Sequence, residues 1–209
     1  MNVLLLSPHT DDVELGCGGT VIKLLEAGHS ILWMVFSTAE ESLPVGLPKD
    51  TLMKEFAAVM GDLGMSEKNY EVFGFGVRHL DEHRQEILDE LVQVRKHLQP
   101  DIVIGPSLKD FHQDHNVVAN EMVRAFKASS SIICYELPWN HVTFDTQLFV
   151  RLGREHISRK VEILNNYESQ LIGGKEYFSE EFVYGLARIR GLQCNSEYAE
   201  AFEVVRWMM

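Results

Sequence analysis

Two short stretches of the sequence concentrate acidic residues and histidines. The first reads Pro8-His9-Thr10-Asp11-Asp12-Val13-Glu14, and the second reads Asp110-Phe111-His112-Gln113-Asp114-His115. Catalytic zinc is usually held by imidazole and carboxylate groups, with one coordination position left open for water or substrate. We therefore expect a metal site made by His9, Asp12 and His115, with zinc or ferrous iron as the ion, because nitrogen and oxygen ligands of this kind accept both.

The other polar residues of these stretches suit a metal-assisted hydrolysis. Asp11, next to the expected ligand Asp12, is predicted to act as general base toward a water activated by the metal. His112 is predicted to donate a hydrogen bond or a proton to a tetrahedral intermediate. Asp114 is predicted to fix the tautomer of one imidazole. Glu14 either supports the site in a similar way or favours the positive end of the helix that follows.

Both stretches follow apolar runs that are typical of buried strands. Strands are expected at 2–6, 30–36, 70–73, 101–105, 131–136 and 202–207, and helices at 18–27, 51–64, 82–98, 116–127, 155–170 and 179–193. This alternation predicts a parallel α/β sheet with right-handed crossovers. Ligands bind beyond the carboxyl ends of the strands in such sheets, so the two stretches are expected to meet there. Acidic residues before a helix are usually caps when taken alone, but their clustering with histidines on two loops favours a site.

The overall composition excludes several classes of protein. A chain of 209 residues with 45% hydrophobic and 24% charged residues is typical of one soluble domain, here 1–209. The formal charge of −12 argues against a nucleic-acid partner. No apolar run is long enough for a transmembrane segment, and the first strand lacks the basic flank of a signal peptide. Three cysteines at wide spacing form no disulfide framework, so a cytoplasmic location is expected.

The glycines after the first strand do not indicate a dinucleotide site. Gly16, Gly18 and Gly19 leave the G-x-G-x-x-G fingerprint incomplete, because Val21 stands where its last glycine or alanine belongs. We expect these glycines instead to allow a close backbone approach at the start of the helix.

The two stretches together resemble the motifs of the PIG-L/LmbE-like de-N-acetylases. The matching residues are Pro8-His9-x-Asp11-Asp12-x-Glu14 with Gly18-Gly19, and His112-x-Asp114-His115. Thr10 stands where the usual first motif of the family has a proline. Four further stretches are similar to members from bacterial surface-glycan pathways: Arg84-Gln85-Glu86-Ile87-Leu88, Pro106-Ser107, Tyr135-Glu136-x-Pro138-Trp139-Asn140 and Tyr198-Ala199-Glu200-Ala201-Phe202.

The resemblance implies a Rossmann-like three-layer sandwich with a mostly parallel sheet. It implies zinc held by His9, Asp12 and His115, with Asp11 as base and with His112 and Asp114 as helpers. The implied reaction is hydrolysis of the N-acetyl group of an amino sugar, such as an N-acetylglucosamine conjugate, to acetate and a free amine. Homo-oligomers are also implied, because members of the family often assemble.

Contacts to the remainder of the substrate are expected from Glu40, Arg78 and Arg84. The two arginines suit an anionic aglycone such as a phosphate, or else surface salt bridges. The loop 39–49, which contains Gly46 and two prolines, is a candidate lid. Two other functions stay open for the same ligands: a metal-dependent esterase or phosphoesterase, and a metal-binding homologue without activity.

Overall fold

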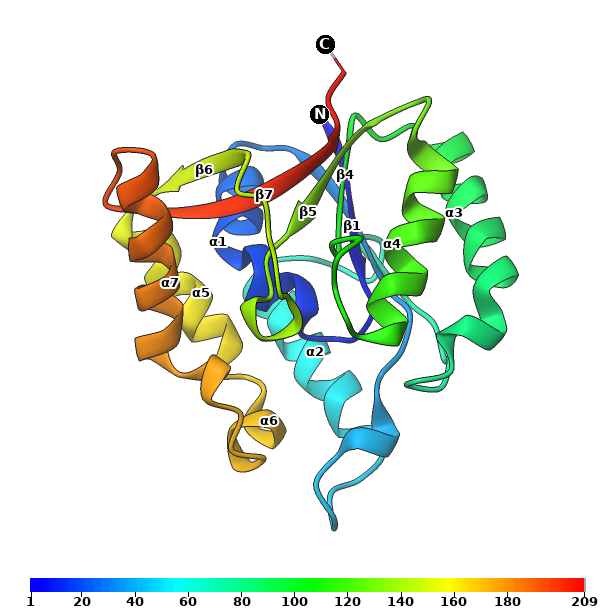
Figure 1. Cartoon of the computed structure of the whole chain (residues 1–209). Coiled ribbons are helices and arrows are strands. Elements are labelled where there is room, and N and C mark those ends of the chain that lie inside the picture. Colours follow the sequence, from blue (N-terminus) through cyan, green and yellow to red (C-terminus); the bar gives the residue numbers. More distant parts are fainter. Residues whose placement is uncertain (209) are drawn as a thin grey trace.

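A computed structural model describes residues 1–208, in which seven strands form one sheet with helices against both faces (Figure 1). The strands are β1 (Asn2–Ser7), β2 (Ser30–Val35), β3 (Tyr70–Val72), β4 (Ile102–Gly105), β5 (Ser131–Tyr135), β6 (Leu148–Leu152) and β7 (Tyr198–Arg206). The α-helices are α1 (Asp12–Glu26), α2 (Thr51–Asp62), α3 (Arg84–Leu98), α4 (Gln113–Phe126), α5 (Arg154–Leu164), α6 (Glu168–Ile172) and α7 (Glu180–Gln193). Short 3-10 turns are η1 (Glu40–Ser42), η2 (Leu80–His83), η3 (Pro138–Asn140) and η4 (Glu176–Phe178). Within the described range, no helix combines the length and apolarity that a membrane crossing requires.

The strand order is β3-β2-β1-β4-β5-β7-β6, with β1 to β5 parallel and the last two strands antiparallel to their neighbours. The expected α/β fold with a mostly parallel sheet is therefore confirmed. The chain builds outward from β1 to β3 and then returns to place β4 on the other side of β1. The gap between the ends of β1 and β4 is thus a topological switch point, where sheets of this kind bind their ligands.

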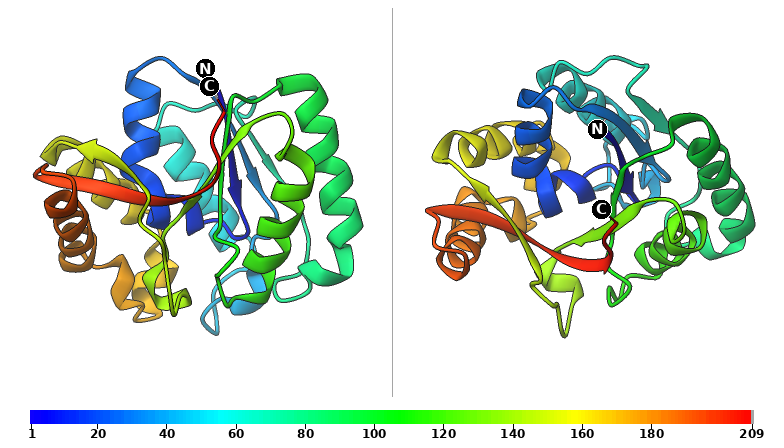
Figure 2. Two further views of the ribbon diagram at one scale, coloured as in Figure 1. Left: turned by 45° about the horizontal axis from the view of Figure 1, so that its top comes forward. Right: turned by 90° about the horizontal axis from the view of Figure 1, so that it is seen from above.

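The side chains of β1 alternate between two cores, as the pleat of a strand requires. Val3 and Leu5 belong to the core beneath α1, α2, α5 and α7, whereas Leu4 and Leu6 belong to the core beneath α3 and α4. Figure 2 shows these two helical layers on opposite faces of the sheet. Because all four β1 side chains are fully buried, the strand that leads to the first acidic stretch is held rigidly on both faces.

Three elements differ from the sequence-based expectation. The first helix begins at Asp12 rather than at 18, and it is broken at Cys17. The segment 155–170 forms two helices, α5 and α6, because two asparagines, which are poor helix formers, follow Leu164. The hydroxyl of Tyr167, between these helices, also donates to the carbonyl of Thr10 in the loop that joins β1 to α1. Strand β6 was not predicted, since it is a short, half-exposed edge strand that exists only by pairing with β7.

Candidate active site

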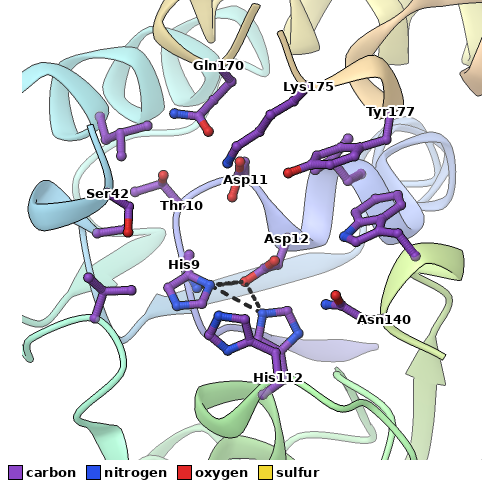
Figure 3. Close-up of a pocket in the computed structure, with 16 residues that line it drawn as sticks. His9, Thr10, Asp11, Asp12, Ser42, His112, Asn140, Gln170, Lys175 and Tyr177 are labelled. Atoms are coloured by element: carbon purple, nitrogen blue, oxygen red, sulfur yellow. Dashed lines mark hydrogen bonds and ion pairs between the residues drawn. The ribbon is translucent and has the colours of Figure 1, made fainter. Parts of the chain in front are cut away.

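The two acidic stretches meet at the switch point between β1 and β4. His9 lies on the loop that joins β1 to α1, and His115 lies in the first turn of α4 after β4. Both residues line a cavity of about 200 Å³, together with Asp11, Asp12 and His112 (Figure 3). The neighbouring parallel strands β1 and β4 thus bring together residues that are more than 100 positions apart in the chain.

Three atoms at the floor of this cavity form a nearly equilateral triangle. The Nδ1 atom of His9 lies 3.2 Å from Oδ2 of Asp12 and 3.2 Å from Nε2 of His115, and the third side, from His115 Nε2 to Asp12 Oδ2, is 3.3 Å. A tetrahedral zinc ion with bonds of roughly 2.0–2.1 Å separates its ligand atoms by about 3.3–3.4 Å. The residues present therefore fit a tetrahedral ion with one open position.

The second nitrogen of each imidazole is held by a carboxylate. Nε2 of His9 is 2.9 Å from Oδ2 of Asp114, and Nδ1 of His115 is 2.8 Å from Oδ2 of Asp110. A carboxylate only accepts hydrogen bonds, so when the imidazoles are neutral these contacts hold the proton on the outer nitrogen and leave the lone pair of the inner nitrogen for an ion in the triangle. Asp114 is itself fixed by the backbone N–H groups of Arg78 and Leu80.

The electrostatics of the cluster favour a cation. Burial alone would lower the pKa of His115, but Asp12 and Asp110 outweigh it and raise that pKa to about 10. Burial alone would likewise raise the pKa of Asp12, but His115 and His9 hold it well below its ordinary range. The carboxylates thus favour positive charge at this point of the cavity, which His115 supplies as a proton in the metal-free protein and which a divalent cation would supply when bound.

His112 is set apart from the other two histidines. It is the N-cap of α4, and its Nδ1 accepts a hydrogen bond from the backbone N–H of Asp114. Burial, followed by the charges of His115 and His9, lowers its pKa to about 4. A neutral His112 whose Nδ1 is an acceptor carries its proton on Nε2. His9, His112 and His115 are also close enough to hold a metal by themselves. The set with Asp12 fits an ion better, because Asp12 carries a negative charge and its Oδ2 lies 3.2 and 3.3 Å from the nitrogens of His9 and His115.

Asp11 occupies the N-cap position of α1 without capping it. Its side chain makes no capping hydrogen bond, is only 9% exposed and lines the cavity. Burial, together with the charge of Asp12, raises its pKa, and Lys175 partly opposes this rise. Figure 3 shows the ammonium group of Lys175 beside the Asp11 carboxylate. The carboxylate thus lies at the cavity without a capping hydrogen bond, where it can act on a bound group.

Glu14 does not face the cavity. Its Oε1 lies 2.7 Å from the hydroxyl of Tyr167, which also donates to the carbonyl of Thr10 at 2.6 Å. Burial raises the pKa of Glu14 well above its ordinary value. The hydroxyl of Tyr167 donates toward both oxygens, so Glu14 and Tyr167 brace the loop between β1 and α1 rather than the candidate metal ligands.

The structure does not bring the three expected substrate contacts into the cavity lining. Glu40 lies on η1 and forms an exposed ion pair with Lys49. Arg78 contributes its backbone N–H to Asp114, and its side chain is exposed. The guanidinium of Arg84 pairs with the fully buried Glu121 on α4 at 3.0 Å. The expected lid 39–49 does reach the cavity, through Ala39 and Ser42.

Several residues that line the cavity were missed by sequence reasoning. Lys175 and Tyr177 come from the α6–η4 region, and Trp139 comes from η3. The rings of Trp139 and Tyr177 are stacked, with centroids 4.0 Å apart and planes 11° from parallel. Trp139 lies within the motif that resembled the family, whereas no pattern in the sequence marked Lys175 or Tyr177 because only packing brings them to the site.

The fold and this cluster define an α/β protein with a candidate metal centre at the switch point of its sheet. Residues 4–126, which include both acidic stretches, match the PIG-L family, described as GlcNAc-PI de-N-acetylase. The match covers more than half of the chain, and this protein belongs to that family.

Individual proteins are similar to this chain over more residues than the family match covers. The uncharacterized deacetylase YaiS of Escherichia coli K12 is 25% identical over 172 residues, which is 80% of this chain and 90% of that protein. The N,N'-diacetylchitobiose deacetylase of Pyrococcus horikoshii is 20% identical, with a TM-score of 0.80 over 98% of this chain and 83% of that chain. GalB, the 4-carboxy-2-hydroxymuconate hydratase of Pseudomonas putida, is also 20% identical, with a TM-score of 0.78 over 100% of this chain and 97% of that chain. Proteins with this fold are thus named for different reactions, so the reaction of this protein has to be inferred from the residues of its site.

Proposed function

We propose that this protein is a zinc-dependent hydrolase that removes the acetyl group from an N-acetylated amino sugar. The observation that carries the proposal is the free, buried carboxylate of Asp11 beside the triangle formed by His9, Asp12 and His115. These three residues would hold the ion. When bound, zinc would polarise the acetyl carbonyl and make a water molecule more acidic. Ferrous iron suits the same ligands, and the metal is part of the test.

The residues around the triangle have separate roles in this hydrolysis. Asp11 accepts a proton from the attacking water, whose oxygen forms the new bond to the acetyl carbon. His112, protonated on Nε2, donates a hydrogen bond to the charge that develops on the intermediate. The carbon–nitrogen bond then breaks, the leaving nitrogen takes up the proton that Asp11 accepted from the water, and the products are acetate and the free amine.

An amino sugar is supported by the family description and by the shape of the cavity. A volume of about 200 Å³ lies below the roughly 300–1,000 Å³ of sites for drug-sized ligands, so the cavity holds a single sugar-sized group and leaves the aglycone outside. The stacked rings of Trp139 and Tyr177 offer an apolar wall for one face of a pyranose ring. The chitobiose deacetylase with the same fold acts on an N-acetylated sugar by its name.

The test is acetate release from N-acetylglucosamine as the free sugar and linked to a nucleotide, a lipid or an oligosaccharide. Metal-free protein is compared with protein reloaded with zinc or, without oxygen, with ferrous iron, and His115→Ala serves as the control that cannot hold the ion. We expect chelator-sensitive acetate release from at least one conjugate. Cleavage of O-acetyl or phosphoester substrates alone, or hydration of a carbon–carbon double bond without acetate release, would replace the proposal with an esterase, a phosphoesterase or a hydratase.

A further inference from the structure

Helix α1 carries Asp12 in its first turn and is broken soon afterwards. Cys17 leaves the helical conformation, with φ −151° and ψ 27°, so the helix consists of a short first segment and a longer second segment (Figure 1). The first segment has little more than one turn, and helices this short are not stable by themselves. A break also leaves backbone C=O and N–H groups on its two sides without helical partners.

One buried ion pair occupies this break. Lys160 on α5 donates to the carbonyl of Leu15, in the first segment, at 2.7 Å. Glu200 on β7 accepts the backbone N–H groups of Gly19 and Thr20, in the second segment, at 3.0 and 2.7 Å. The two side chains pair with each other at 2.8 Å and are 7% and 6% exposed. The cation thus meets the carbonyl end of one segment and the carboxylate meets the amide end of the other, which matches the helix dipoles.

Two of the glycines around the break lie against the same pair, whereas Gly16 lies against the ring of Tyr135. A Cβ atom on Gly18 would lie 3.2 Å from Cγ of Lys160, and one on Gly19 would lie 3.2 Å from Oε1 of Glu200 and 2.7 Å from Leu152. Gly18 and Gly19, which follow the first acidic stretch, and the glutamate of the Tyr198–Phe202 motif therefore serve one contact, although they are about 180 residues apart.

We propose that Lys160 and Glu200 are positioning residues for the candidate metal centre. By joining both sides of the break, the pair sets the direction of the first segment, which carries Asp12 and follows directly on Asp11. Leu15, whose carbonyl Lys160 binds, lines the cavity itself. The inference rests on the proposed function for its catalytic consequence, but its consequence for metal binding stands apart from the reaction.

The experiment compares the full-length wild type with Lys160→Met, Glu200→Gln and the double variant, which removes both charges and so avoids a lone buried charge. Zinc affinity is measured by competition with a coloured chelator, hydrogen exchange is followed at the amides of residues 12–20, and kcat and KM are measured on the best N-acetylated conjugate. We expect the double variant to bind zinc about tenfold more weakly. Its amides at 12–20 should exchange faster, and its kcat should fall while KM stays unchanged.

Lys23→Met is the matched control. Lys23 lies in the second segment and also donates to a backbone carbonyl at 2.7 Å, that of Arg151, so this variant should retain zinc affinity, exchange at 12–20 and kcat. The inference is overturned if the double variant unfolds at a lower temperature but binds zinc and turns over like the wild type. A wild type that binds zinc but releases no acetate would refute the proposed function, while the zinc affinities and exchange rates would still decide this inference.

Discussion

Asp110 holds the outer nitrogen of His115, with 2.8 Å between its Oδ2 and His115 Nδ1. Both groups are nearly inaccessible, with side-chain exposures of 1% and 2%. Asp110 also accepts the backbone N–H of His112, so one carboxylate fixes two histidines of the site. The second acidic stretch therefore contains a residue that supports the site and that sequence reasoning did not assign.

Asp110→Asn should weaken zinc binding by about 10–100-fold, because loss of a carboxylate behind a ligating imidazole reduces its basicity and its orientation. Chelator competition measures the effect. Asp101→Asn, at the opposite end of β4, makes the same charge change on an exposed residue and should leave zinc affinity unchanged. Equal affinities for wild type and Asp110→Asn would show that this contact is structural only.

Asp11→Asn should lower kcat by about 10²–10⁴-fold and leave the zinc content unchanged, because removing a general base slows proton transfer without removing a ligand. Acetate release and elemental analysis of the same sample provide the two values. Loss of zinc from this variant would instead place Asp11 among the ligands.

Zinc binding should release protons at pH 7.5. In the metal-free protein, burial opposes protonation of His115, but Asp12 and Asp110 raise its pKa from 6.5 to about 10, so the imidazole is protonated at this pH. A ligand must be neutral, so zinc affinity should increase as the pH rises toward 10. Titration calorimetry in two buffers of different ionisation enthalpy measures the release, and equal heats in both buffers would contradict it.

The same raised pKa also predicts how the stability of the metal-free protein depends on pH. Because the pKa of His115 is higher in the folded than in the unfolded protein, its protonation stabilises the folded state. This contribution to the free energy of unfolding is complete below about pH 6.5 and is lost as the pH rises through about 10. Thermal unfolding of metal-free protein across this range should show the decline. The contribution should be absent in metal-free His115→Ala, which serves as the control.

Arg84→Met should lower the free energy of unfolding by about 1–3 kcal/mol, because it leaves the buried carboxylate of Glu121 without its main partner. The value is reduced from that of a fully buried pair since the Arg84 side chain is 43% exposed. KM should not change, because Arg84 lies outside the cavity lining. Urea unfolding and substrate saturation measure the two effects; a raised KM with unchanged stability would return Arg84 to the substrate site.

Trp139→Ala should raise KM by about tenfold with little change in kcat, because a lost stacking contact of about 1–1.5 kcal/mol affects binding of the ring rather than the chemistry. Trp139→Phe should retain most of the affinity. Trp207→Ala, a tryptophan of similar exposure outside the cavity lining, is the control. Unchanged KM in Trp139→Ala would exclude this wall from sugar binding.

The sequence by itself determined the α/β fold and the composition of the central cluster. Strands such as β1 and β4 are short and almost continuously apolar, and residues just after parallel strands must gather at one edge of the sheet. His9, Asp12 and His115 were therefore expected to converge, and the structure places their candidate ligand atoms 3.2–3.3 Å apart.

Only the tertiary structure decided the surroundings of that cluster. The paths of long loops and the packing of α5, α6 and β7 bring Lys160, Lys175 and Glu200 beside α1 and the cavity, and these contacts depend on the summed packing of segments far apart in the chain rather than on any local pattern. For the same reason Arg84 turned toward Glu121 and not toward the cavity. Local sequence specifies which groups follow each strand, whereas burial and pairing across the fold decide which other side chains meet them.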